Sequence, residues 1–242
     1  MSLREFAEKC KELGGKPRKS SSQLAPYDIL YCEDLPSLDK MMELRKFSAK
    51  ILEEEISKYP KGPFPYRLHM NCSFDQGGRK VFFSIEEGLK EDGTIEESIT
   101  YERDLSSSHT LEEMNKILER DHVVGEQYLS TLESEAWRKW RRHGRRIFED
   151  VLRNVGVRPN VSFSGAFTEF TNVVGVFTIA YRDPREFLET EDYVREILRV
   201  LDVFGERVEK DTPIRDRIVG EVAEKARNLK VERLTDRIYL IE

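Results

Sequence analysis

The chain has 242 residues, of which 38% are hydrophobic and 36% are charged, and its formal net charge is −6. This length is sufficient to bury a core of its own. The acidic balance excludes a protein that is basic all over and coats nucleic acid or an anionic membrane, so any site for a polyanion must be local. No stretch approaches the ~20 apolar residues of a membrane span, so we expect no membrane partner.

The polar composition resembles that of proteins adapted to heat. Glutamine occurs three times in the chain, whereas Lys, Arg and Glu dominate its polar residues. Heat-adapted proteins show the same bias, because networks of ion pairs stabilise a protein more at high temperature. The three cysteines, Cys10, Cys32 and Cys72, are odd in number and show no paired spacing, so we expect neither a disulfide framework nor a zinc site. The sequence therefore predicts a cytoplasmic protein in a reducing compartment, without metal or cofactor.

The first part of the chain predicts a helix followed by a linker. Residues 3–13 have the pattern of a short amphipathic helix that ends at a pair of glycines. Residues 16–24 are basic and rich in serine, which is typical of a flexible linker. We therefore expect residues 1–24 to form a loosely attached arm and residues 25–242 to form a single α+β domain, which could divide near 156–160.

Alternation of apolar and polar residues predicts antiparallel strands in the first half of this domain. The pattern covers residues 66–74, 81–86 and 95–102. Glycine turns separate the three segments, which indicates a meander with one apolar and one polar face. Before it, the sequence predicts a strand at 27–32 and a long helix from about residue 36 to 58.

Helices and a hairpin are predicted in the second half. A helical pattern opens with a capping box at 110–113 and runs to about residue 155, and either it breaks at Gly125 or Gly144 or it projects as a long rod. Two β-rich segments, two helices and a closing hairpin follow, at residues 160–170, 173–182, 186–204, 213–228 and 231–241. The predicted fold class is α+β, with a mostly antiparallel sheet covered by long amphipathic helices.

A run of cations without one acidic residue lies between residues 137 and 146. At ~100° per residue, the cations fall on one side of a helix, opposite an apolar stripe that includes Trp140. Guanidinium groups suit phosphate oxygens, and an indole at the rim could stack on an unpaired base. The predicted nucleic-acid-binding residues are Trp137, Arg138, Lys139, Arg141, Arg142, Arg145 and Arg146.

Three interpretations of this surface are open. It could bind DNA or RNA phosphates without enzymatic activity, assisted by Lys16, Arg18 and Lys19 of the N-terminal arm. It could be a solvated face whose arginines pair with acids of the same molecule. It could also take part in self-assembly, because residues 86–135 carry a net charge of −11 and residues 136–158 a net charge of +6, and such blocks can dock between copies of a chain.

A second functional hypothesis places a catalytic site on the polar side of the predicted meander. His69, Asn71 and Ser73 share one strand face, and Glu86 could lie opposite them on the next strand, which are residue types that a hydrolase can use. No nucleophile elbow or phosphate loop accompanies them. The same pattern also fits the hydrated face of a sheet, so His69 and Glu86 are catalytic candidates of an alternative hypothesis only.

Overall fold

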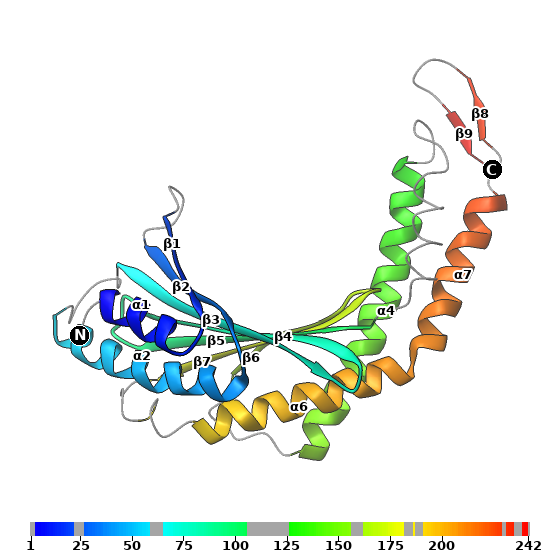
Figure 1. Ribbon diagram of the computed structural model, residues 1–242. Helices are drawn as coiled ribbons and strands as arrows, with labels where there is room; N and C mark the ends of the chain where they lie inside the picture. Colours follow the sequence, from blue (N-terminus) through cyan, green and yellow to red (C-terminus); the bar gives the residue numbers. More distant parts are fainter. Residues whose placement is uncertain are drawn as a thin grey trace. The chain divides into compact units, whose positions relative to one another are not determined.

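A computed structural model of the chain shows its architecture (Figure 1). It describes residues 3–21, 27–58, 65–105, 126–155, 162–181, 186, 191–228, 231–234 and 239–241. The chain divides into two compact units. Unit 1 comprises Met1–Arg103, Leu152–Gly165 and Val174–Asp202, and unit 2 comprises Asp104–Val151, Ala166–Val173 and Val203–Glu242. The expectation of one domain over residues 25–242 stays a prediction.

Helices and strands are mixed along the chain, which confirms the predicted α+β class. The helices among the described residues are α1 (Leu3–Glu12), α2 (Leu38–Lys58), α4 (Glu126–Val155), α6 (Glu191–Lys210) and α7 (Thr212–Asn228). The strands there are β1 (Lys16–Ser21), β2 (Asp28–Leu35), β3 (Tyr66–Gln76), β4 (Arg79–Leu89), β5 (Ile95–Asp104), β6 (Ser162–Thr168), β7 (Asn172–Tyr181), β8 (Val231–Arg233) and β9 (Tyr239–Ile241).

Seven strands form one sheet in the order β1-β2-β3-β4-β5-β7-β6, and β8 and β9 form a separate antiparallel pair. The meander of β3, β4 and β5 is antiparallel, as the alternation predicted, whereas β2 pairs with β3 in parallel. Odd-numbered residues of β4 and β5 are mostly buried, and even-numbered residues are mostly half-buried. Helix α2 lies against β2, β3 and β4 (Figure 1), so the apolar face is the one that a helix covers.

Residues 16–21 form a strand, although the sequence predicted a flexible linker over residues 16–24. β1 pairs antiparallel with β2 at one edge of the sheet. An edge strand can be polar on both faces, so the alternation that marks an inner strand is missing here. Each cation of β1 meets an acid of β2, in the pairs Lys16–Asp34 at 2.8 Å, Arg18–Glu33 at 2.8 Å and Lys19–Asp28 at 2.6 Å.

A disulfide joins Cys10 of α1 to Cys32 of β2, so the expectation of no disulfide was wrong. The two cysteines are 22 residues apart, and only the packing of α1 on β2 brings them together. Gly15 lies against the bond, because a Cβ at this position would come within 2.5 Å of Cys32 Sγ. The prediction of a reducing compartment, which rested on cysteine usage, loses that support.

Unit 1 buries an ion pair in its core. Arg45 of α2 donates from Nε to Glu97 Oε2 at 2.6 Å and from Nη2 to Glu97 Oε1 at 2.9 Å, and the two side chains are 1% and 0% exposed. The hydroxyl of Tyr181 in β7 donates to Glu97 Oε1 at 3.0 Å. Three hydrogen bonds to one carboxylate stabilise its ionised form, which compensates for its removal from water.

Glu87 of β4 is a second buried carboxyl group in this cluster and is the register partner of Glu97. Burial and the neighbouring Glu97 carboxylate raise the pKa of Glu87 to about 8. Ser48 Oγ lies 2.6 Å from Glu87 Oε2 and 2.8 Å from the carbonyl oxygen of Arg45. Since a serine hydroxyl has one proton, it cannot donate to both acceptors. A protonated Glu87 satisfies both contacts by donating to Ser48, which then donates to the carbonyl.

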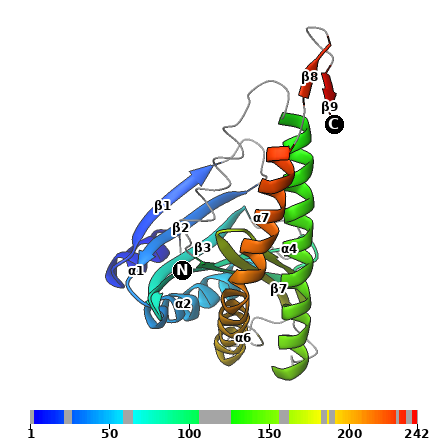
Figure 2. The same cartoon turned by 90° about the vertical axis from the view of Figure 1, so that its right-hand side faces the viewer.

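Helix α4, whose residues up to Val151 belong to unit 2, is one continuous helix that runs beside α7 (Figure 2). Gly144 lies inside α4 without breaking it. Its role is in packing, because the neighbouring residue leaves no room for a side chain at this position. A Cβ on Gly144 would come within 2.4 Å of Thr168 Cγ2. Thr168 Oγ1 also donates to the carbonyl oxygen of Trp140 at 3.3 Å, and the Trp140 indole donates to the carbonyl oxygen of Glu169 at 3.0 Å. These contacts fix the rotation of α4 about its axis.

No helix in the described part of the chain is both long enough and apolar enough to cross a membrane.

Candidate functional site

All six predicted cations lie on the exposed side of α4. The buried side of this helix consists of residues spaced three or four apart, namely Ala136, Trp140, Gly144, Ile147, Phe148 and Val151. The exposed residues between them are Arg138, Lys139, Arg141, Arg142, Arg145 and Arg146. The helical periodicity therefore predicted correctly which face of α4 carries the positive charge.

Two of the six cations pair with carboxylates of the same molecule. Lys139 Nζ lies 3.4 Å from Glu221 Oε2, and both side chains are about half exposed. Arg145 Nε lies 3.0 Å from Glu149 Oε1, and the arginine side chain is 79% exposed. Exposed pairs of this kind are weak and exchange partners easily. They do not prevent either cation from binding an external anion.

The other four cations form no ion pair within the ranges that the structure describes. Arg138 Nε donates to the carbonyl oxygen of Ser134 at 3.2 Å, and the Arg141 guanidinium lies 4.5 Å from the centre of the Trp137 ring. Arg142 and Arg146 have no carboxylate beside them in those ranges. The interpretation in which acids of the same molecule neutralise the whole basic face thus applies to two of its six cations.

Trp137 is half-buried and already has two ring partners. The ring packs edge to face with Phe170, at 5.4 Å between centroids and an interplanar angle of 80°. The Arg141 guanidinium covers the indole as well. A nucleic-acid base could stack there only if Arg141 moved away. Trp137 is therefore better suited to holding Arg141 in place than to the base stacking that the sequence suggested.

Helices α4 and α7 run side by side (Figure 2), and side chains from both line a groove; the residues that line it belong to unit 2. Its volume is about 340 Å³, and its charged lining has four cations against one carboxylate. We call it the cationic groove, and it is lined by Lys139, Arg142, His143, Arg146, Ile214, Arg217, Ile218 and Glu221. Two apolar side chains at its wall reduce the local dielectric, which strengthens the attraction between the cations and a bound anion.

Arg217 lines the cationic groove but is not among the binding residues predicted from the sequence. It lies on α7, where acidic and basic residues alternate and no run of charge stands out. It forms no ion pair with any residue in the described ranges. Only the packing of α7 beside α4 brings its guanidinium to the side of Arg142 and Arg146.

His143 lies at the wall of the cationic groove and is held on two sides. Its Nε2 lies 2.8 Å from Asp211 Oδ2, at the junction of α6 and α7. Its ring stacks on the buried Trp140, with centroids 5.8 Å apart. The contact with Asp211 joins α4 to the start of α7, whereas Trp140 belongs to α4 itself. The two helices that carry the cations are thus linked at this point before an anion binds.

His69 and Glu86, the alternative catalytic candidates, are register partners on β3 and β4. Glu86 does not orient His69, because Arg67 Nη1 donates to Glu86 Oε1 at 2.9 Å. His69 Nδ1 is buried without a hydrogen-bond partner in the described part of the chain, and burial lowers the pKa of this imidazole. The base and orienter of a hydrolase are thus not paired, and the hydrolase hypothesis gains no support from this geometry.

Several members of the acidic stretch at residues 86–135 are occupied inside unit 1. Glu87 and Glu97 are buried, and Arg67 lies between Glu86 and Glu96, at 2.9 and 3.4 Å. These four carboxylates are not available to the basic block of another copy. The rest of the stretch, with the predicted capping box at residues 110–113 and Gly125, includes residues 106–125, which lie outside the described residues.

No protein-family model matches the chain, and neither the curated proteins nor the solved structures contain a match to it.

Proposed function

We propose that this protein binds nucleic acid by holding backbone phosphates in the cationic groove between α4 and α7. The observation that carries the proposal is the lining of the groove, in which Lys139, Arg142, Arg146 and Arg217 face a single carboxylate. In an acidic chain, such a local surplus of cations over carboxylates attracts anions. Contacts of this type are made to phosphates and not to base edges, so this part of the binding is independent of sequence and involves no chemical reaction.

Two features of the structure change the set of phosphate-binding residues that the sequence predicted. Lys16, Arg18 and Lys19 of β1 lie beside an equal number of acids of β2, so this strand pair carries no local surplus of positive charge, and we no longer include these three cations in the proposed site. Arg217 takes their place and lies on the opposite wall of the groove from Arg142. A phosphate between two helices can be contacted from two sides, which a single basic helix does not permit.

We also propose an intracellular location, and the Cys10–Cys32 disulfide sets a condition on it. Disulfides are rare in the cytosol of organisms that grow at moderate temperature but are common inside hyperthermophiles. The low glutamine content and the high content of Lys, Arg and Glu agree with a heat-adapted protein. An intracellular location of this protein, together with its disulfide, therefore implies that its organism lives at high temperature.

The proposal is tested by titrating the protein with short duplex DNA, single-stranded DNA and RNA at several salt concentrations. Neutralisation of about four or five phosphates gives a slope of log affinity against log salt between about −3 and −5, depending on the form of nucleic acid. Replacement of Arg142, Arg146 and Arg217 by glutamine should reduce the slope to about a third and weaken binding at least tenfold.

The matched control replaces Lys16, Arg18 and Lys19 by glutamine. This variant loses the same number of positive charges, but from residues that already have carboxylate partners. We expect binding within about threefold of the unmodified protein, because these three cations line neither cavity and lie among an equal number of carboxylates. Equal losses in the two variants would mean that only net charge matters, and no binding to any nucleic acid at low salt would refute the proposal.

A further inference from the structure

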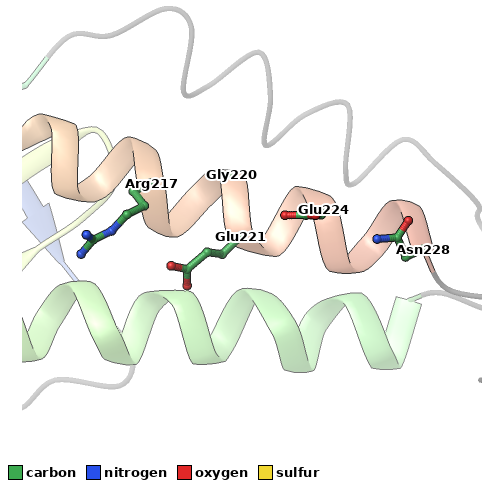
Figure 3. A pocket seen from close by; sticks show the side chains of 5 residues that line it. All are labelled: Arg217, Gly220, Glu221, Glu224 and Asn228. Atoms are coloured by element: carbon green, nitrogen blue, oxygen red, sulfur yellow. The ribbon is translucent and has the colours of Figure 1, made fainter.

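A second cavity continues from the cationic groove along α7. Its volume is about 550 Å³, and it is lined by Arg217, Gly220, Glu221, Glu224 and Asn228. Arg217 and Glu221 line both cavities, so the two form one furrow. Figure 3 shows Arg217 and Glu221 directed toward α4, with Glu224 and Asn228 farther along α7. We call the second cavity the acidic end of the furrow.

The charge reverses along this furrow. Among the described residues, the cationic groove is lined by four cations and one carboxylate, whereas the acidic end is lined by Arg217, Glu221, Glu224 and Asn228, of which Glu221 also pairs with Lys139. Glu224 forms no ion pair within the described ranges, so its oxygens are available as acceptors. A phosphate chain that continued through the acidic end would be repelled. A ligand that fills the whole furrow must therefore be an anion at one end and a hydrogen-bond donor at the other.

Gly220 provides an independent indication that the acidic end is kept open. Glycine inside a helix is less stable than alanine by roughly 1 kcal/mol, so it calls for a reason. At Gly144 the reason is Thr168, which leaves no room for a Cβ. At Gly220 a Cβ would meet no atom of the described residues within 4 Å, so packing within the described part of the chain does not require a glycine there. The missing side chain leaves the backbone of α7 open to a flat group in the furrow.

We infer that the acidic end holds a nucleobase with an exocyclic amine, and that the furrow therefore takes single-stranded nucleic acid. This inference rests on the proposed function, since the phosphates of the same strand occupy the cationic groove. Carboxylates accept hydrogen bonds from the amine of cytosine, and asparagine pairs with the edge of adenine. Thymine presents carbonyl oxygens in place of an amine, and Glu224 repels them. A duplex hides the base edges that face its partner strand, whereas a single strand exposes them.

The test compares short single strands of deoxycytidine and of thymidine, equal in length, by fluorescence anisotropy at one salt concentration. The two homopolymers have the same phosphate charge and similar base size. We expect the deoxycytidine strand to bind about tenfold more tightly, which corresponds to about one good contact between a side chain and a base edge. Equal affinity would overturn the inference and leave the proposed function standing. If neither strand bound, both this inference and the proposed function would be refuted.

Two variants locate the preference. Glu224→Gln replaces an acceptor by a group that can also donate, and Gly220→Leu fills the acidic end with a side chain. Both should abolish the preference while thymidine binding stays within about twofold. Glu206→Gln, an exposed carboxylate of α6 that lines neither cavity, should preserve it. Gly220→Leu should not lower the melting temperature, because leucine favours a helix. A preference that survives in both furrow variants would show that the base binds elsewhere.

Discussion

The two units use arginine in opposite ways. In unit 1, Arg45 is buried and makes two hydrogen bonds to Glu97, so its charge is cancelled where it lies. In unit 2, Arg142 and Arg146 are exposed and form no ion pair with the residues that the structure describes. A buried charge must find its partner within the molecule, because removal from water is too unfavourable otherwise. An exposed cation in a groove has no such requirement and can bind an external anion.

The largest expected difference between the two uses is in stability. Glu97→Ala leaves the Arg45 guanidinium buried without its partner, which should lower the free energy of unfolding by about 3–5 kcal/mol. Arg142→Ala and Arg146→Ala together should change it by less than about 0.5 kcal/mol, since neither residue has a partner to lose. Urea denaturation measures both. If the groove variant proved as unstable as Glu97→Ala, the division between structural and ligand-binding arginines would be wrong.

The Cys10–Cys32 disulfide provides a second comparison between the stability of unit 1 and ligand binding by unit 2. The bond stabilises the N-terminal part of unit 1. Replacing both Cys10 and Cys32 by alanine should lower the free energy of unfolding by about 3 kcal/mol, owing to the greater entropy of the unfolded chain. Affinity for nucleic acid should not change at temperatures where the variant is folded, since the cationic groove belongs to unit 2. Thermal melting and anisotropy together check this. A loss of binding without unfolding would contradict it.

Glu87 predicts how the buried cluster responds to pH. Its pKa is raised to about 8 by burial and by Glu97, so the folded protein holds a proton that the unfolded chain releases above the usual carboxyl pKa. The stabilisation is complete at low pH and decreases as the pH rises toward 8. Glu87→Gln cannot ionise. Relative to the unmodified protein, it should gain roughly 2 kcal/mol between pH 6 and pH 8, with a limiting slope of about 1.4 kcal/mol per pH unit.

Unfolding curves measured at several pH values provide the check. The matched control is Glu86→Gln, because Glu86 lies next to Glu87 but pairs with Arg67 on the half-buried face. Its pH dependence should parallel that of the unmodified protein. A constant difference between Glu87→Gln and the unmodified protein would show that Glu87 is ionised throughout this range.

The smallest expected effects are those of substituting two helical glycines of unit 2, Gly144 and Gly220. Gly144→Ala places a methyl group against Thr168 and should destabilise the protein by about 1–2 kcal/mol. Gly220→Ala fills open space and should stabilise it by up to about 1 kcal/mol. Thr168→Ala should partly rescue Gly144→Ala, because it removes the two closest atoms. Equal effects of the two glycine substitutions would contradict the packing described for α4.

Local periodicity was sufficient to predict much of the fold and one wall of the site. The spacing of Ala136, Trp140 and Val151 identified the buried side of α4, and alternation identified the meander. The same alternation also places two carboxyl groups among the apolar residues. Glu87 follows Ile85, and Glu97 lies between Ile95 and Ile99, so their positions already placed both carboxylates on the apolar face. A carboxylate at such a position predicts a buried cation, which the structure supplies as Arg45.

Other features depend on contacts between distant segments and have no local signature. The disulfide requires α1 to pack on β2, and β1 lacks alternation because it is an edge strand. Arg217 is one charge among several on α7 and gains its role only from its position beside α4. The acidic end of the furrow likewise consists of residues that would be ordinary on any exposed helix.

The composition of β1 also bears on how the protein behaves at high concentration. Open borders of β-sheets tend to recruit strands from other molecules and so begin aggregation. Pro17 has no amide hydrogen to offer to an incoming chain, and the flanking Lys16, Arg18 and Lys19 are held in place by ion pairs. This border of the sheet is thus poorly suited to pairing with a strand of another molecule.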